Sequence, residues 1–388
     1  MAGGDVFMKI REGFLQTKVG GQAYVLPYGQ NIADHCDGIA LNDTGEILWR
    51  GLEEGCDKNE LTELLKTEYG LGDEMDDQLS RDVEQFQNRL VRMGILLEER
   101  EEFHGWEPQF FHIGAITAAY KGPEVIFERF FRKFAVDAGD GKADLTIQIV
   151  CLPPIHHKNG RVLLRSDGVL LMGVGEEYLF LFPGFPALRE MRVKRDGSCA
   201  ELNCDHDLIE QYAEDIFHAI RFAALVAAGE RGFFFLHSAS FLYRGRAWLF
   251  SGRSGTGKST HTNLWRDAYG VELLNGDLNM LGIDGGEAVV YGQPWCGTSG
   301  ICTEKAYPLG GITFLRQAPE NICEEPAASE KILAIVQRMI SPAWERQMLE
   351  RNIAFAKKVE ACCPVWRLHC RADREAVEVM KGAVDNIC

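Results

Sequence analysis

The chain has 388 residues, of which 46% are hydrophobic and 25% are charged, and its formal net charge is −16. This length exceeds the usual size of a single hydrophobic core, so we expect a globular protein of two or three domains. The acidic balance argues against a nucleic acid or an anionic membrane surface as the main partner. No apolar run approaches the length of a membrane span and the first residues lack a secretory layout, so a cytoplasmic location is expected.

Twelve cysteines are spread from Cys36 to Cys388 without a C-x-x-C pair. In a long chain without a secretory signal, this usage indicates reduced thiols rather than disulfides or zinc ligands. We interpret His369 and Cys370 in the same way, as surface and packing residues.

Residues 1–103 predict a small domain of strands followed by three helices. Alternating stretches around Gly20 and Gly21 are typical of a hairpin. The next helix follows the cap at residues 42–44, and another runs from Asp57 to Gly70. Residues 80–93 carry apolar side chains at helical spacing. This pattern is typical of a winged-helix-like module.

The charged segment 98–108 fits neither the helical nor the strand spacing of apolar residues, so it predicts a domain boundary. Residues 108–204 are rich in strand patterns with weak helical signals, and the predicted strands are 145–152, 161–166, 168–174 and 177–184. Residues 205–388 begin with a long amphipathic helix expected from about Asp207 to Gly232. Two apolar strands joined at Arg244-Gly245 follow, and later segments alternate strand and helix. The predicted fold class is therefore a multi-domain α/β protein.

Residues 252–259 fit the phosphate-binding pattern G-x-x-x-x-G-K-[ST], between an apolar strand and a helix-compatible segment. The glycines let backbone amides turn toward phosphate oxygens, and a helix opening at Lys258 adds its positive dipole end. Lys258 is expected to neutralise the outer phosphates of ATP, while Ser259 places a hydroxyl on Mg²⁺. The alternative is a glycine-rich turn without a ligand. The predicted nucleotide-binding residues are Gly252, Ser254, Gly255, Thr256, Gly257, Lys258, Ser259 and Thr260.

Phosphoryl transfer also needs a carboxylate that holds the metal or takes the hydroxyl proton. Asp277 ends an apolar run after the loop and is the predicted metal ligand and candidate base. The competing interpretation is a turn aspartate, because Asn-Gly is itself a turn signal. His237 lies in the strand before the loop. Two interpretations of this histidine stay open, a buried core residue and a residue of the site. Lys258, Asp277 and His237 are the predicted catalytic residues.

The loop and its flanks resemble HPr kinase/phosphorylase and its relatives, which share a P-loop fold with phosphoenolpyruvate carboxykinase. His237 precedes Gly252 at the family's spacing, and residues 252–259 match its loop pattern G-x-S-G-x-G-K-S. The resemblance implies a pair of aspartates after the next strand, one on the metal and one acting as base. This chain has Gly276-Asp277 instead, and Thr260 replaces the glutamate of the bacterial regulatory enzymes.

Three explanations of the missing aspartate stay open. Asp277 serves in both roles, or His237 contributes as base or orienting group, or phosphoryl transfer is weakened and only nucleotide binding remains. The resemblance covers residues 230–315 well and the rest loosely, which favours a relative over the regulatory enzyme itself.

Residues 291–300, YGQPWCGTSG, resemble a segment of HPr-kinase-like proteins found beside ribosomally made peptide natural products. The resemblance makes Gly297, Thr298 and Ser299 candidate donors to a phosphate or an acceptor. The alternative is a structural loop pinned by Trp295.

The first hundred residues resemble PqqD, a small peptide chaperone of cofactor and peptide-maturation pathways. The matching stretches are ALNDTGEILWRGLEEG, LTELLKTEYG and DVEQFQNRLVRMGILLE. The resemblance implies that a leader peptide adds as a strand beside the hairpin. Residues 18–26, 39–41 and 80–93 would form its groove. A domain used for dimerisation or packing is the alternative.

Together these patterns predict an ATP- and Mg²⁺-dependent kinase for serine or threonine in a leader-bearing peptide, because tethering raises the local concentration of acceptor hydroxyls. A peptide-maturation enzyme is a second expected partner. A small-molecule kinase for a serine-type acceptor is an alternative, and deletion of residues 1–103 would separate the two. A nucleotide-gated peptide chaperone without phosphoryl transfer is another, supported by Gly276.

Overall fold

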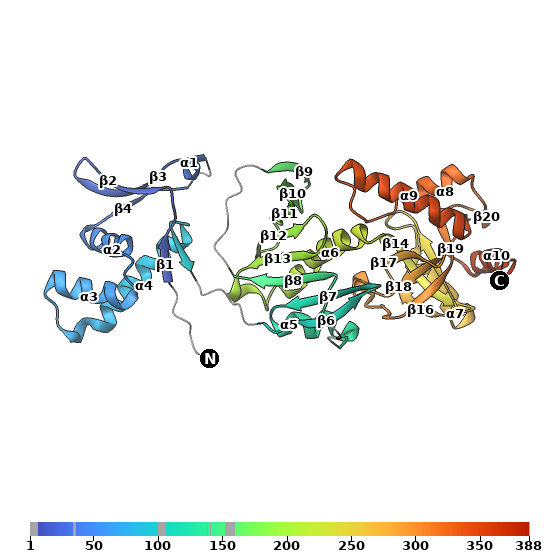
Figure 1. Cartoon of the computed structure of the whole chain (residues 1–388), viewed down its shortest axis with the longest axis horizontal. Helices are drawn as coiled ribbons and strands as arrows, with labels where there is room; N and C mark the ends of the chain where they lie inside the picture. The colour runs from blue at the N-terminus through green and yellow to red at the C-terminus, as the bar shows by residue number, and fades with distance from the viewer. Residues whose placement is uncertain are drawn as a thin grey trace. The chain divides into compact units, whose positions relative to one another are not determined.

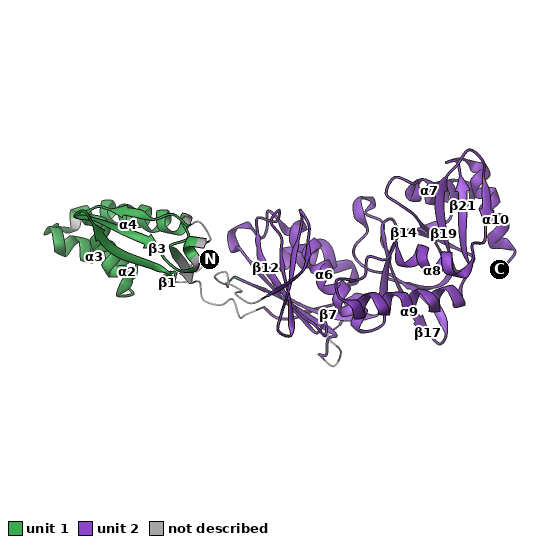
Figure 2. Cartoon of the chain, turned by 90° about the horizontal axis from the view of Figure 1, so that it is seen from above, with its two compact units in different colours: residues 1–104, 151–155 green, residues 105–150, 156–388 purple. Residues whose placement is uncertain are grey.

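The computed structural model describes residues 7–33, 36–99, 106–137, 139, 141–151 and 160–387. Its contacts divide the chain into two compact units (Figure 2). The first comprises residues 1–104 and 151–155, and the second comprises residues 105–150 and 156–388. The strand-rich segment and the phosphate-loop segment therefore belong to one unit. The predicted boundary segment 98–108 lies largely outside the described residues.

The first unit combines a three-stranded antiparallel sheet, ordered β2-β3-β4, with helices and a separate strand pair, β1-β5. Its apolar core gathers side chains from the sheet and all three longer helices, among them Val25, Trp49, Leu61 and Leu90. The elements are β1 (Phe7–Ile10), β2 (Phe14–Val19), β3 (Gln22–Pro27), α1 (Gln30–Ala33), β4 (Ile39–Leu41), α2 (Asp43–Glu53), α3 (Lys58–Tyr69), α4 (Asp76–Arg92) and β5 (Leu96–Glu99).

The helix ends of this unit follow the predicted caps. The side chain of Asn42 accepts a hydrogen bond from the amide of Gly45 at the start of α2. Asp57 forms a reciprocal capping box at the start of α3, and Gly70 ends that helix in the left-handed conformation. Helix α4 begins at Asp76, earlier than predicted. Its first turn is polar, so the spacing of apolar residues does not reveal it.

The second unit contains a first sheet ordered β6-β7-β8-β13-β12-β11-β10-β9, whose pairs β7–β8 and β8–β13 are parallel (Figure 1). The sequence patterns predicted β8 to β11 only. Its strands are β6 (Gln109–Ile113), β7 (Ile116–Lys121), β8 (Leu145–Val150), β9 (Arg161–Arg165), β10 (Leu170–Val174), β11 (Glu177–Leu181), β12 (Leu188–Lys194) and β13 (Cys199–Cys204). A short helical segment, 124–134, follows β7 and packs aromatic rings against the sheet.

A second sheet in the same unit carries the phosphate loop. Its order is β15-β14-β17-β18-β19-β21-β20, with β16 beside β14 and β15 also paired with β19. Strands β15, β19 and β21 run parallel. The strands are β14 (Phe234–Tyr243), β15 (Arg246–Ser251), β16 (Glu272–Asn275), β17 (Leu278–Asp284), β18 (Glu287–Tyr291), β19 (Ala306–Gln317), β20 (Ile322–Glu324) and β21 (Val365–Cys370). The turn between β14 and β15 falls at Arg244 and Gly245, as predicted, and both have positive φ.

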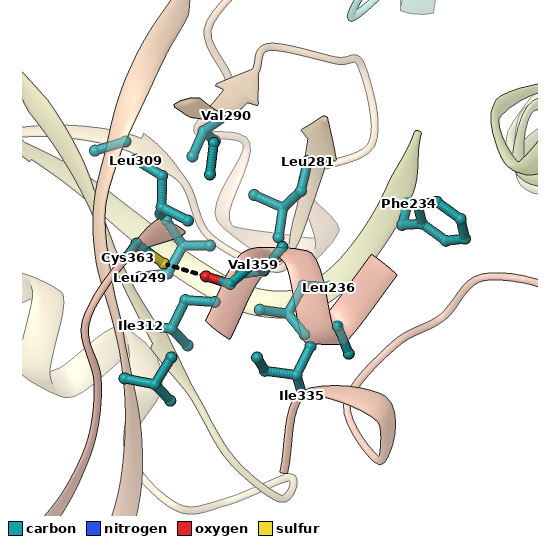
Figure 3. Close-up of a cluster of buried hydrophobic side chains, with 14 of the residues drawn as sticks. Phe234, Leu236, Leu249, Leu281, Val290, Leu309, Ile312, Ile335, Val359 and Cys363 are labelled. Atoms are coloured by element: carbon teal, nitrogen blue, oxygen red, sulfur yellow. Dashed lines mark hydrogen bonds between the residues drawn. The ribbon is translucent and has the colours of Figure 1, made fainter. Parts of the chain in front are cut away.

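Helices cover both faces of this second sheet. On one face, α8 (Ala328–Val336) and α9 (Arg346–Cys362) bring Ile335 and Val359 into a core with Leu249 of β15 (Figure 3). On the other face, α7 (Lys258–Tyr269) and α10 (Arg374–Asp385) pack against Phe250. The consecutive residues 249 and 250 point to opposite faces, as strand geometry requires. The predicted α/β class is confirmed.

Helix α6 (Ala213–Glu230) contacts β8, β12 and β13 of the first sheet and β14 of the second, so it ties the two sheets of this unit together. The predicted start near Asp207 is wrong. Asp205 caps a separate 3-10 turn at His206–Leu208, and the regular helix begins only at Ala213. In the part of the chain that the structure describes, no helix is long and apolar enough to cross a membrane.

Candidate functional site

The predicted phosphate loop, residues 252–259, lies between the end of β15 and the first turn of α7. Gly257 precedes the helix with φ of 97°, a conformation that favours glycine, and no side chain caps the helix. The first amides of α7 are therefore open to an external acceptor. A Cβ at Gly252 would lie 2.6 Å from Thr256 Oγ1, so the loop closes tightly there. This is the geometry that an anion cradle requires.

Lys258 is the first residue of α7 and is half-buried. Burial lowers the pKa of its ammonium, Asp277 opposes that shift, and Arg338 adds to it. Ser259 and Thr260 follow on the first helical turn with exposed side chains. Ser254 and Gly255 are also exposed, so four of the predicted loop residues face solvent beside a partly desolvated cation, while Gly252 is buried.

Asp277 lies in the turn between β16 and β17. Asn275 Oδ1 accepts hydrogen bonds from the amides of Asp277 and Leu278, both at 2.9 Å. The Asn-Gly-Asp segment is thus a turn held by an asparagine side chain, and this turn carries the carboxylate into the site. A turn aspartate and a candidate metal ligand are therefore compatible interpretations of Asp277.

His237 faces Asp277 across the sheet. Strand β14 pairs with β17 so that His237 lies opposite Leu278, and His237 Nε2 lies 3.3 Å from Asp277 Oδ1. The hydrogen bond from His237 holds the pKa of Asp277 below its ordinary value, and Arg221 and Lys258 act in the same direction. The side chains of Asp277 and His237 are 40% and 26% exposed, so an ionised carboxylate is accessible from solvent. The predicted residues Lys258, Asp277 and His237 lie together.

The segment 297–299 forms the opposite wall. A Cβ at Gly297 would lie 2.8 Å from Asp277 Cβ, so the backbone of this 3-10 turn presses directly on the carboxylate. Trp295 is buried, and its indole donates to the carbonyl of Phe217 at 3.1 Å. The loop is therefore pinned by Trp295, and its Gly297 lies against Asp277, while the role of residues 297–299 as donors to a phosphate or an acceptor stays a prediction.

A cleft of about 610 Å³ opens beside the phosphate loop, and residues 252–256 of the loop line it. Four arginines line it, which concentrates positive charge in a chain whose net charge is −16. They are Arg253, Arg316, Arg338 and Arg367. Sequence reasoning missed them, since they come from a loop, two strands and a helix end without a common motif. Arg367 is already paired with Glu324 and Glu330.

The first unit has its own hollow, about 530 Å³ in volume, beside the outer strand β2. Lys18 of β2 and Glu46 and Arg50 of α2 line it, and Lys18 pairs with Glu46 at 2.9 Å. Leu15 and Val19 on the same strand are 58% and 57% exposed. An outer strand with exposed apolar side chains is a geometry that accepts an added strand.

Comparison with known proteins finds a family model that matches within the first unit. Residues 32–96 match the family model of coenzyme PQQ synthesis protein D (PqqD). The solved structure of TbiB1 in complex with the TbiA(beta) leader peptide is 19% identical and matches 24% of this chain and 99% of that chain, with a TM-score of 0.20. The HPr(Ser) kinase/phosphatase from Coxiella burnetii is 11% identical and matches 39% of this chain and 97% of that chain, with a TM-score of 0.24.

No curated protein matches the chain. The PqqD match spans α2, α3 and α4, the helices on which the N-terminal resemblance was drawn. The predicted resemblance of the first unit to PqqD is thus met by the family model.

Proposed function

We propose that this chain is an ATP- and Mg²⁺-dependent kinase that phosphorylates a serine or threonine hydroxyl of a peptide bound by its N-terminal unit. One observation carries the proposal: the uncapped helix start with Lys258 faces an ionised Asp277 that is hydrogen-bonded to His237. A triphosphate needs the helix start and Lys258, the metal needs the carboxylate of Asp277, and the proton of the acceptor hydroxyl needs Asp277 or His237 as its base.

The residues present fit a magnesium nucleotide. Asp277 supplies a carboxylate whose depressed pKa keeps it ionised, and Ser259 presents an exposed hydroxyl on the first turn of α7. Oxygen ligands of these two kinds are the ones Mg²⁺ takes beside substrate phosphates. Bound there, the ion would neutralise charge on the β- and γ-phosphates. Ser259 and Asp277 are the proposed metal ligands.

The chain's own groups provide the remaining steps. Lys258 and the loop amides hold the β- and γ-phosphates, so that the γ-phosphorus points toward Asp277. The acceptor hydroxyl gives its proton to Asp277, which His237 orients, while the acceptor oxygen forms its bond to phosphorus. The bond from the γ-phosphorus to the bridging oxygen breaks at the same time, and ADP leaves with that oxygen. His237 is the second candidate for the proton.

The N-terminal unit supports a peptide acceptor over a metabolite. Strand β2 is an outer strand whose Gln16 and Lys18 line the mixed-charge hollow, while Leu15 and Val19 are exposed on its opposite face. A leader segment bound along this strand would gain backbone hydrogen bonds and side-chain contacts. Its tethered hydroxyls would then reach an effective concentration on the order of millimolar, as flexible linkers provide.

The nucleotide half of the proposal is tested by calorimetry on the full chain. Wild type should bind MgATP, and Lys258→Ala should weaken binding about 100-fold or more, because the partly desolvated ammonium is lost. Asp277→Asn should keep nucleotide affinity within about tenfold while abolishing transfer. Equal affinity in wild type and Lys258→Ala would refute a kinase at this loop.

The acceptor half is tested with radiolabelled γ-phosphate. The acceptors are peptides encoded by short reading frames beside this gene and, in parallel, free L-serine. A Leu15→Lys/Val19→Lys variant should lose peptide phosphorylation by raising KM, because charge on an outer strand opposes strand addition. Leu333→Lys on α8, 56% exposed in wild type, is the matched control. Phosphorylation of L-serine unaffected by the β2 variant would favour the metabolite kinase, and nucleotide-dependent peptide binding without transfer would favour the chaperone.

A further inference from the structure

Helix α6 presents one face toward the Asp277 turn. Phe217 and Arg221 are four residues apart on α6 and therefore share that face. The carbonyl of Phe217 accepts the indole hydrogen bond of Trp295, and the two rings stack at 5.4 Å. The helix is thus fixed against the loop that carries Trp295.

A relay of hydrogen bonds connects this contact to Asp277. Asn275 Nδ2 donates to the carbonyl of Trp295 at 3.2 Å, and Asn275 Oδ1 accepts the amide of Asp277. Gln293 adds a second donor to the same Trp295 carbonyl at 2.7 Å. These groups are buried, so the relay is rigid. It holds the face of α6 that carries Arg221 beside the Asp277 turn.

Arg221 is partly buried on this face, whereas Glu214, three residues before Phe217, is exposed and pairs with Arg129. Burial lowers the pKa of its guanidinium, and the nearby Asp277 opposes that shift. Among the residues that the structure describes, no hydrogen bond or ion pair at 4.0 Å or less reaches its side chain. Other arginines of the same unit, such as Arg195 and Arg351, are paired with Glu345 and Glu230.

A partly desolvated guanidinium without an ion-pair partner is unfavourable unless an anion completes its environment. Arg221 and Lys258 both lower the pKa of Asp277, so both cations lie within electrostatic reach of its carboxylate. A dianionic phosphoryl group beside Asp277 would be attracted by both cations. The planar fork of arginine matches phosphate oxygens in a way that lysine does not.

We propose that Arg221 binds the terminal phosphoryl group of the nucleotide as it passes from Lys258 toward the acceptor at Asp277. This assignment rests on the proposed function and adds a catalytic residue from an element outside the phosphate loop. Arg221 neutralises charge on the equatorial oxygens during transfer. Its contribution belongs to the transition state more than to nucleotide binding.

The test compares MgADP with MgADP plus fluoroaluminate, a mimic of the transferring phosphoryl group, by calorimetry on the full chain. Wild type should bind MgADP at least about tenfold more tightly when fluoroaluminate is present. Arg221→Gln should bind MgADP alone within twofold of wild type yet lose that gain. Arg221→Lys should keep part of it, because charge remains but the fork is lost. Arg129→Gln, which removes an exposed guanidinium 3.4 Å from Glu214 of α6, is the matched control and should behave as wild type.

The melting temperature separates a binding role from a structural one. Removing an unpaired, partly buried cation should leave the nucleotide-free Arg221→Gln protein at least as stable as wild type. A clear fall in its melting temperature, with the fluoroaluminate gain intact, would make Arg221 a counterion of Asp277 only and overturn the assignment. Wild type that binds MgADP but gains nothing from fluoroaluminate would also overturn it. Failure of wild type to bind MgADP would instead refute the proposed function on which it rests.

Discussion

The hydroxyl of Ser299 occupies the space that a side chain at Gly276 would need. A Cβ at position 276 would lie 2.2 Å from Ser299 Oγ and 2.6 Å from Ser299 Cβ, and Ser299 Oγ donates to the carbonyl of Cys296 at 2.7 Å. The absent second aspartate and the serine turn are therefore one coupled feature. The site is built for a single carboxylate, that of Asp277.

This coupling predicts the outcome of restoring the aspartate. Gly276→Asp should lower the free energy of unfolding by about 1–3 kcal/mol, because it overfills the contact with Ser299. Gly276→Asp combined with Ser299→Gly should recover most of that loss. Urea unfolding of both single variants and the double variant measures the coupling. Additive effects of the two substitutions would contradict the steric account.

His237 is predicted to act on transfer and not on nucleotide binding. His237→Ala removes the 3.3 Å contact with Asp277, so turnover should fall about 100-fold or more while MgATP affinity changes little. Calorimetry and phosphate-transfer assays measure the two effects separately. His206→Ala is the matched control, since His206 has a comparable carboxylate contact, 3.2 Å from Asp207, in the 3-10 turn before α6. Equal losses in the two variants would argue against a role for His237.

Cys302 is predicted to be an unusually reactive thiol. A hydrogen bond from Cys296 lowers the pKa of Cys302 to about 6, and the ammonium of Lys133, 3.8 Å from Cys302 Sγ, acts in the same direction. Alkylation by iodoacetamide should therefore rise through pH 6 and level off near neutral pH, since the thiolate is the nucleophile. Lys133→Ala should shift that profile upward in pH. Mass spectrometry of the labelled peptide reports the rate of alkylation. Cys323 provides an internal comparison, because burial raises its pKa to about 11.

The contact between Tyr178 and Glu345 is predicted to stabilise the second unit in a pH-dependent way. The Tyr178 hydroxyl donates to Glu345 at 2.5 Å, and this bond holds the pKa of Glu345 below its ordinary value, with Arg195 adding to it. A carboxyl whose folded pKa is depressed stabilises the fold above its unfolded pKa and loses that effect as pH falls. Tyr178→Phe should therefore cost about 1–3 kcal/mol near pH 7. The difference from wild type should shrink below the ordinary glutamate pKa of about 4.3.

Urea unfolding at neutral and acid pH measures that difference. Arg346→Ala on α9 removes an exposed ion pair with Glu350 and is the control, expected to change stability by less than about 1 kcal/mol at either pH. A Tyr178→Phe effect that is the same at both pH values would show that packing, and not the charge on Glu345, carries the stabilisation.

Local sequence determined the features that depend on a few neighbouring residues. The phosphate loop, the caps at Asn42 and Asp57, and the turn at Arg244-Gly245 follow from backbone preferences and short-range hydrogen bonds. The start of α6 was mispredicted, because apolar spacing continued into a separate 3-10 turn. Strands β6, β7, β12 and β13 were missed, since strand preference depends on the partners each strand finds.

The identity of the loop, its lysine and its candidate carboxylate were thus available from sequence alone. Only the tertiary structure decided what surrounds them. Strand register places His237 opposite Leu278, and the hydrogen bonds of Trp295 bring Arg221 from a distant helix to Asp277. Contacts between segments far apart in the chain are set by sheet pairing and core packing, and neither leaves a short-range pattern in the sequence.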